Sequence, residues 1–357
     1  MKRYTLAAVC VLLCLSGCLP AIQPENRAIV QAAAVDFEDG NWAVTLQLFD
    51  PGAGGDSAAS TGGWNTAQAD GTTLSQTLAA MEAQSGKKLF WGSCQLLAVG
   101  RETALRPVLD FCNSLPQSRS AMMVVMADPA GELLKGDENQ QESPAEQAER
   151  LLLLAEQEHR LPPCRMMQLL AAMETEGRDG ILPLLAVNEE GAPALNGSVV
   201  LCREEPALDL SPEETALLGM LQGGTGRFLL MPDIPGTAVA VETLRARLDC
   251  RMEDGLPLLQ AELNARGRLT EGKGFAAEQP LPEQTAAPQQ AAARELTVQT
   301  EALLQKLCAA GCDPLRFGER LYRKQPELWL ETASQSWPEL LKKARWQVDT
   351  ACRLDKG

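Results

Sequence analysis

The chain has 357 residues, of which 45% are hydrophobic and 22% are charged, enough for two or three ordinary domains and too balanced for a disordered stalk. Its 32 basic and 47 acidic side chains give a formal net charge of −15 at pH 7. A surface this acidic argues against nucleic acid as a partner and against a protein that lies flat on anionic lipid headgroups.

Residues 1–17 are typical of a lipoprotein signal peptide. Lys2 and Arg3 precede an apolar run over residues 4–15 that is too short to span a bilayer as a stable helix. The run ends in the tetrapeptide Leu15-Ser16-Gly17-Cys18, where small residues precede a cysteine whose thiol takes up diacylglycerol. We therefore predict that Cys18 is the lipidation site, an N-palmitoyl and S-diacylglycerol cysteine, and that the protein lies outside the cytoplasm. An ordinary secretory signal or an uncleaved anchor is the alternative.

Residues 18–24 are expected to form an extended, lipid-anchored tether, because Pro20 and Pro24 lie too close together for a longer transmembrane helix. Two or three acyl chains on one cysteine exceed the marginal binding of a single chain, since each buried methylene adds roughly 0.8 kcal/mol. Attachment to the membrane through Cys18 should then be permanent.

The fold class that we predict is α+β, with two or three domains, each a mixed or largely antiparallel sheet with packed helices. The first domain is expected over residues 25–187 and begins with a β-hairpin whose turn contains Asp39 and Gly40. The next segment, 51–73, is rich in Gly, Ser, Ala and Asp and is expected to be a long surface loop. The predicted elements are strands over 28–35 and 42–48, a helix over 74–85, a strand formed by 88–91 and 95–99, a helix over 101–112, a strand over 121–127, a helical stretch over 145–172 broken by prolines at 162 and 163, and a strand over 182–187.

Two features of this domain are candidate functional residues. His159 is the one histidine of the chain, so any Ser-His-Asp or Cys-His catalytic system would depend on it, but its charged neighbours are typical of a solvated helix face. Met122, Met123 and Met126 form either a pliant binding surface or, as we favour, part of a core strand.

The second domain is expected over residues 188–357, with a possible subdivision near 235–240. Ser211 and Glu214 form a capping box at the start of a predicted helix. Three segments alternate apolar with polar or charged residues and are expected to gather in one half-buried sheet. The predicted elements are a strand over 195–201, the capped helix up to 222, the alternating strands over 244–252, 259–263 and 346–354, a flexible excursion over 271–293, a helix over 296–310 and an amphipathic segment that ends at 343.

Eight cysteines follow Cys18, too widely spaced for a disulfide scaffold, and most are expected to be buried small apolar residues. Cys308 and Cys312 are predicted to lie four apart on one face of a helix, a spacing that would suit a redox or metal role, yet no histidine or second cysteine pair accompanies them. We therefore predict no metal, no cofactor and no catalytic residue. The eight are Cys94, Cys112, Cys164, Cys202, Cys250, Cys308, Cys312 and Cys352.

A specific pattern lies near the C-terminus, in the order Asp313, Phe317-Gly318, Tyr322-Arg323-Lys324, Pro326, Trp329 and Trp337. It resembles the C-terminal signature of the Ger(x)C family, the lipoprotein C subunits of spore germinant receptors. Further motifs fall upstream in the family's order, so that the resemblance covers nearly all of the chain after the signal peptide. They are Gly92, Leu109-Asp110-Phe111, Leu182-Pro183 and the segment 195–200.

The chain departs from the family at two points. Leu19-Pro20 follows Cys18 where family members often carry Trp-Asp, and Ser93 stands where a histidine is often seen. These differences leave open which receptor and which nutrient the subunit would serve.

The resemblance implies a non-catalytic, lipid-anchored subunit on the outer face of the inner spore membrane. Its partners would be two integral membrane germinant-receptor subunits, one of them transporter-like, with which it would sense nutrients and trigger germination. The alternative is a lipid-anchored extracytoplasmic solute-binding receptor that holds a ligand between its domains. An anchored hydrolase is a third hypothesis, against which the lone His159 argues.

Overall fold

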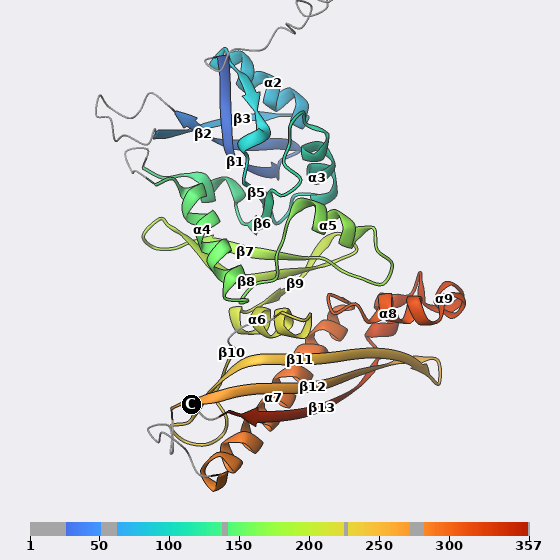
Figure 1. Cartoon of the computed structure of the whole chain (residues 1–357). Coiled ribbons are helices and arrows are strands. Elements are labelled where there is room, and N and C mark those ends of the chain that lie inside the picture. Colours follow the sequence, from blue (N-terminus) through green and yellow to red (C-terminus); the bar gives the residue numbers. More distant parts are fainter. Residues whose placement is uncertain (1–25, 51–62, 138–141, 225–227, 272–281, 356–357) are drawn as a thin grey trace, which may run out of the picture.

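The computed structural model of the chain describes residues 26–50, 63–137, 142–224, 228–271 and 282–355. They form a nine-stranded sheet and a four-stranded sheet, each with packed helices, so the predicted α+β class is confirmed. Figure 1 shows the nine-stranded sheet in the upper part of the molecule and the four-stranded sheet in the lower part.

The nine-stranded sheet is mixed. Its order is β3-β2-β1-β5-β6-β7-β8-β9, and β4 pairs with β1. β1 is antiparallel to β2 but parallel to β5, and antiparallel pairing returns at β7 and β8. The strands are β1 (Arg27–Glu38), β2 (Asn41–Asp50), β3 (Gly63–Gly71), β4 (Lys88–Phe90), β5 (Leu96–Gly100), β6 (Met123–Ala127), β7 (Ile181–Val187), β8 (Pro193–Cys202) and β9 (Glu205–Leu210).

The predicted hairpin is confirmed by β1 and β2, which pair up to Glu38 and Asn41. Asp39 and Gly40 at its turn have φ angles of 49° and 79°, the left-handed angles that this kind of turn requires. Neighbouring residues of β1 face opposite sides of the sheet, so β1 contributes to the cores on both faces.

The strand predicted from 88–91 and 95–99 is in fact two strands, β4 and β5, separated by a helical turn at residues 91–93, and two further strands of this sheet were not predicted. β3 occupies part of the segment 51–73 that was expected to be a surface loop, and residues 51–62 lie outside the described part of the chain. β3 forms because it pairs with β2 along its whole length and buries Trp64, which is 4% exposed. β9 was not predicted, and it pairs with β8. In both cases a neighbouring strand stabilises a segment whose own apolar content is low.

Helices cover both faces of the nine-stranded sheet. The helices α2, α3 and α5 pack on one face, while α4 and the 3-10 helix η3 pack on the other. α3 begins at Leu105 rather than at residue 101, and Ser143 starts α4 with a capping box. The bounds are α2 (Leu74–Ser85), η2 (Trp91–Ser93), α3 (Leu105–Ser114), η3 (Ala130–Leu134), α4 (Pro144–Gln157) and α5 (Met166–Met173).

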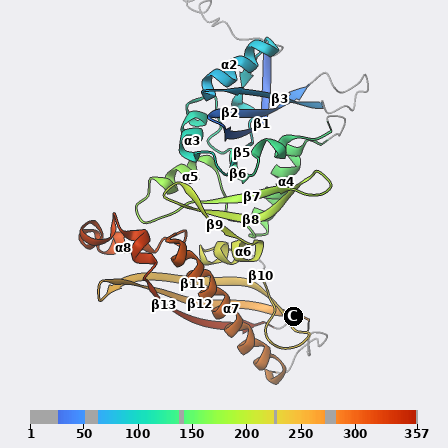
Figure 2. The ribbon, with the colours of Figure 1, turned by 180° about the vertical axis from the view of Figure 1, so that it is seen from behind.

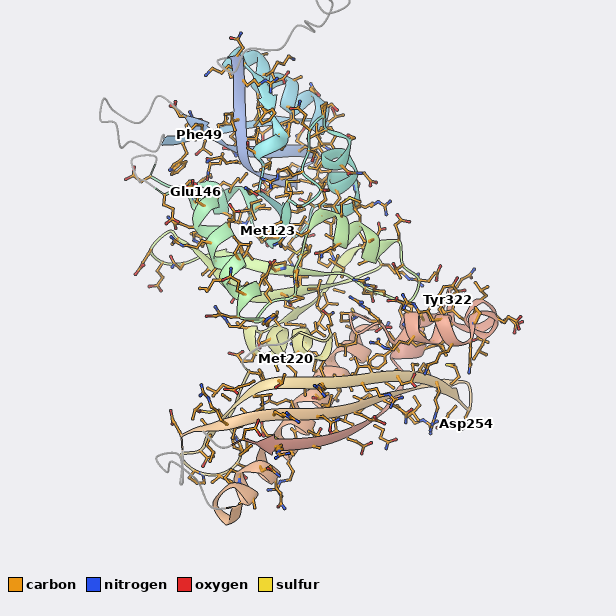
Figure 3. All side chains as sticks on the ribbon, in the orientation of Figure 1. Phe49, Met123, Glu146, Met220, Asp254 and Tyr322 are labelled. Atoms are coloured by element: carbon orange, nitrogen blue, oxygen red, sulfur yellow. The ribbon has the colours of Figure 1, made fainter. Side chains whose placement is uncertain are left out.

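Helix α6 (Pro212–Leu221) lies between the two sheets, as Figure 2 shows from behind and as the label of Met220 in Figure 3 marks. Its predicted capping box of Ser211 and Glu214 is confirmed. The core below it includes Val200 of β8 and Leu210 of β9, so one apolar cluster joins the two parts of the molecule.

The four-stranded sheet has the order β10-β11-β12-β13 and gathers the three alternating segments, as predicted. β11 and β12 form an antiparallel hairpin, whereas β13 is parallel to β12. The strands are β10 (Phe228–Leu230), β11 (Ala238–Glu253), β12 (Leu256–Glu271) and β13 (Arg345–Leu354).

Helix α7 crosses one face of this sheet (Figure 2) and contradicts part of the predicted flexible excursion over 271–293. Residue 271 ends β12, residues 282–293 belong to α7, and 272–281 lie outside the described residues. The helix extends this far because Ala291 and Ala292 are buried against the sheet. The C-terminal helices are α7 (Pro282–Ala310), α8 (Phe317–Lys324), α9 (Pro326–Leu328), the π-helix η4 (Trp329–Ala333) and α10 (Trp337–Leu341).

The domain boundary that we placed between residues 187 and 188 falls in the connection between β7 and β8. These strands are antiparallel neighbours, so the sheet of the first expected domain continues to Leu210. We refer to the nine-stranded sheet with its helices as the N-terminal half, and to α6 with all that follows as the C-terminal half. None of the described helices is both long and apolar enough to cross a membrane.

Candidate functional site

The predicted lipidation site, Cys18, lies outside the described residues and stays a prediction. His159 lies in the exposed turn that closes α4, where its φ is 54° and its backbone N–H donates to Glu156 O (3.0 Å). Met122, Met123 and Met126 are 1%, 5% and 0% exposed, so the preferred interpretation of a core strand is confirmed.

Cys308 and Cys312 do not share a helix face, contrary to the prediction. α7 ends at Ala310, and Gly311 (φ 73°) turns the chain so that Cys312 N donates to Leu307 O (3.0 Å). The Cys312 thiol instead lies close to the thiol of Cys202, at the end of β8; Cys312 Sγ donates to Ala310 O (3.8 Å) and Cys202 Sγ donates to Gly311 O (3.7 Å). The interaction between the two thiols lowers the pKa of the Cys202 thiol, whereas the same interaction and burial raise the pKa of the Cys312 thiol.

The remaining cysteines after Cys18 are buried, as expected of small apolar residues. Burial raises the pKa of the Cys112 and Cys164 thiols to about 12, so both are protonated at neutral pH. Among the described residues, no group of three or more His, Cys, Asp or Glu side chains is placed to hold a metal ion.

The signature residues near the C-terminus meet at Asp313, which is 2% exposed between α7 and α8. Its Oδ1 accepts a hydrogen bond from Phe317 N (2.9 Å) and its Oδ2 accepts one from Gly318 N (2.7 Å). These N–H groups belong to the first turn of α8 and have no partner within the helix. Asp313 therefore acts as the capping side chain of α8, whose N-cap residue Arg316 makes no such bond.

The segment between α5 and β7 lies against this cap. Gly177 O accepts from Glu319 N (2.9 Å), and Asp179 N donates to Asp313 O (3.1 Å). In return, Asp313 N donates to Asp179 Oδ2 (2.6 Å). Asp179 and Asp313 thus exchange backbone and side-chain hydrogen bonds between the two halves.

The two signature tryptophans complete the contact. Trp337 Nε1 donates to Asp313 Oδ2 (3.0 Å), while Trp329 Nε1 donates to Glu176 Oε2 (3.1 Å). The two indole rings lie 5.2 Å apart with an interplanar angle of 55°, a tilted arrangement favourable for aromatic pairs. We call this contact the junction: Glu176, Gly177 and Asp179 on the N-terminal side, and Asp313, Gly318, Trp329 and Trp337 on the C-terminal side.

Burial changes the electrostatics of the junction. It raises the pKa of Asp313 to about 6, against the opposing effect of the hydrogen bonds from Gly318, Phe317 and Trp337. Burial likewise raises the pKa of Asp179, although the backbone N–H groups of Asp313 and Arg203 favour its ionised form. Asp313 is therefore ionised at neutral pH and takes up a proton in mildly acidic solution.

The junction fixes the position of the C-terminal half relative to the nine-stranded sheet. The C-terminal residues of the junction were identified from the sequence, because they belong to a motif with a characteristic spacing. It did not find Gly177 or Asp179, which lie in a short polar connection that carries no recognisable motif.

Two family profiles match the chain. The one described as "Spore germination protein N-terminal domain" matches residues 21–187, and the one described as "Spore germination B3/GerAC like, C-terminal" matches residues 196–356. A solved structure described as the crystal structure of the GerBC protein has the same fold, with a TM-score of 0.60 and 14% sequence identity. The similarity covers 90% of this chain and 96% of that one. No curated protein sequence matches the chain.

Proposed function

Because the chain belongs to the spore germination B3/GerAC-like family, we propose that it is the lipid-anchored C subunit of a nutrient germinant receptor. The observation that carries this proposal is the pair of family profiles, which together span residues 21–187 and 196–356. The role of the subunit is to assemble with two integral membrane subunits, one of them transporter-like, and to help convert a nutrient signal into germination.

The junction supports a role that depends on a fixed shape. Asp313 and Gly318 contact the N-terminal half directly, through the hydrogen bond to Asp179 and the packing against Gly177, while Trp337 holds the Asp313 carboxylate in place. A subunit that acts through protein contacts needs such a defined surface, and it needs no catalytic group. We therefore propose that the protein is not an enzyme.

The place of action follows from the predicted anchor. Lipidation of Cys18 would hold the N-terminal half near the outer face of the inner spore membrane, because β1 begins only nine residues later, at Arg27. The partners would then meet the protein from the membrane side.

The test uses spores that carry an affinity-tagged copy of the chain in place of the native one. After membrane extraction in mild detergent, two multi-pass proteins should copurify in constant proportion, and deletion of the chain should abolish germination with the nutrient of that receptor. A matched copy with Cys18→Ala should neither copurify with the two multi-pass proteins nor support germination with that nutrient. Normal nutrient germination in the deletion strain would refute the proposal.

The alternative, an extracytoplasmic solute-binding receptor, makes a different prediction for the isolated protein. Thermal unfolding of the purified chain with amino acids, sugars and nucleosides separates the two, since a ligand at 100 times its dissociation constant adds roughly 2.7 kcal/mol of stability. A midpoint that no nutrient raises favours an assembly subunit, and a clear rise with one nutrient favours the receptor.

A further inference from the structure

A cavity of about 190 Å³ lies beside the junction, between the two halves. The N-terminal half contributes Gln168 of α5 and Arg178 of the connection to β7, and the C-terminal half contributes Gln222 and Arg316. Polar side chains from four separate segments therefore line one partly open cavity.

Two guanidinium groups in this lining have no partner. Among the described residues, neither Arg178 nor Arg316 makes an ion pair or a side-chain hydrogen bond, and Nε of Arg316 is buried without an acceptor. Burial and the positive charge of Arg316 lower the pKa of Arg178, against the opposing effect of the Glu319 carboxylate, so the two like charges lie close enough to repel each other. A buried donor left unpaired is costly, and the chain has an excess of carboxylates that could have satisfied it.

The position of Arg316 is imposed by the junction. Its φ and ψ are 65° and 36°, a left-handed conformation that costs an arginine more than it costs Gly or Asn. The loop is fixed on both sides, because Arg316 N donates to Asp313 O (3.3 Å) and Phe317 N donates to Asp313 Oδ1 (2.9 Å). The guanidinium is therefore held at the cavity at the expense of backbone strain.

We propose that this cavity binds a small oxyanion, with a carboxylate or phosphate group placed between Arg178 and Arg316. The anion would accept hydrogen bonds from Nε of Arg316 and from Arg178, and would neutralise their mutual repulsion. Arginine suits this task because its planar array of donors matches the oxygens of both groups. The inference is independent of the membrane role proposed above.

The nearby carboxylates do not occupy this place. Asp179 lines the cavity, but its Oδ2 accepts from Asp313 N (2.6 Å) and its Oδ1 accepts from Arg203 N (3.4 Å). Glu319 is paired with Arg323 through Oε1 (2.6 Å), and its buried Oε2 has no hydrogen-bond partner. Among the described residues, neither carboxylate is hydrogen-bonded to Arg178 or Arg316, which leaves the donors of the two arginines for an external anion.

The volume limits the ligand. At about 30 Å³ for each water in liquid, the cavity holds the equivalent of about six waters. Phosphate or a short carboxylic acid fits this space, whereas a nucleotide or an oligosaccharide exceeds it. A ligand here would touch Arg178 of one half and Arg316 of the other, and would therefore strengthen the junction.

The experiment measures thermal unfolding and binding calorimetry of the purified full chain in sodium phosphate, sodium acetate and sodium chloride at equal ionic strength. We expect the midpoint to rise with phosphate, acetate or both, relative to chloride, and the effective anion identifies the head group. Arg178→Gln, and separately Arg316→Asn, should weaken binding at least tenfold. Arg316→Asn keeps a residue that tolerates the left-handed conformation, so it should fold.

The matched control is Arg245→Gln with Arg266→Gln, two exposed arginines on the open face of the four-stranded sheet, and it should keep the full response. The proposal is overturned if phosphate and acetate act no differently from chloride, or if the Arg178 and Arg316 variants respond like the control. A crystal structure grown in phosphate that shows only water between the two arginines would also overturn it.

Discussion

Gly177 and Gly318 lie back to back across the junction, so close that a Cβ on Gly177 would stand 2.4 Å from the carbonyl carbon of Gly318. Gly177 also has a φ of 68°, an angle that side chains disfavour. The contact between the halves therefore requires glycine at both positions, because a side chain on either residue would clash with the backbone of the other half.

Replacement of Gly177 by alanine should destabilise the protein strongly. The new methyl group meets backbone atoms that cannot rotate away, and the left-handed angle adds to the cost, so we expect a loss of about 3 kcal/mol in the free energy of unfolding. Chemical denaturation with urea measures this loss. Gly40→Ala is the matched control, because Gly40 has a φ of 79° with nothing within 4 Å of a Cβ. It should cost only about 1 kcal/mol, and equal losses in the two variants would contradict the role of the junction.

Asp313 should make stability depend on pH in the mildly acidic range. Burial raises its pKa from 3.8 to about 6, so between these values the folded protein binds more protons than the unfolded chain. The stability that Asp313 contributes is then fully present below pH 3.8 and falls as pH rises toward 6, by about 3 kcal/mol in total.

Asp313→Asn removes this titration and serves as the reference. The free energy of unfolding is measured for both proteins at several pH values between 4 and 7. The stability of the unmodified protein relative to Asp313→Asn should fall as pH rises to about 6 and then stay constant. A difference that widens with pH would mean that the hydrogen bonds from Phe317, Gly318 and Trp337 outweigh burial.

Much of the fold follows from local sequence patterns. The hairpin at Asp39 and Gly40, the capped helix after Ser211 and the alternating strand over 244–252 each carry their own signal in charge, capping or periodicity. β3 and β9 carry no such signal, since they form through pairing with a neighbouring strand that local patterns do not specify.

The candidate site was predictable on one side only. Asp313 and Trp337 belong to a recognisable motif, but Asp179, the partner of Asp313, lies 134 residues away in the chain. The proximity of Cys312 to Cys202 was missed for a related reason: α7 ends at Ala310, two residues before the helical spacing of Cys308 and Cys312 requires, because the chain turns at Gly311.

Cys18→Ala should abolish lipid labelling and release the protein from membranes. The thiol of Cys18 is the predicted acceptor of the diacylglycerol, and without acyl chains an acidic protein has little affinity for anionic lipid. Metabolic labelling with a radioactive fatty acid, followed by membrane flotation, measures both effects. Cys14→Ala is the control and should remain labelled, whereas persistent labelling of Cys18→Ala would show that the signal has been misassigned.

Mild oxidation should join Cys202 to Cys312 and leave Cys308 reduced. The neighbouring Cys312 thiol lowers the pKa of the Cys202 thiol, which is also the more exposed of the two, so Cys202 should react first. A disulfide reagent accepts the two electrons: the Cys202 thiolate displaces one thiol from it to form a mixed disulfide, and Cys312 then displaces the second thiol and loses its proton. The closed loop of about 110 residues would stabilise the junction by up to about 4 kcal/mol.

Peptide mapping without reductant should show Cys202 linked to Cys312. The Cys308→Ser variant is the control and should form the same link. A link between Cys308 and Cys312 would contradict the observed turn at Gly311.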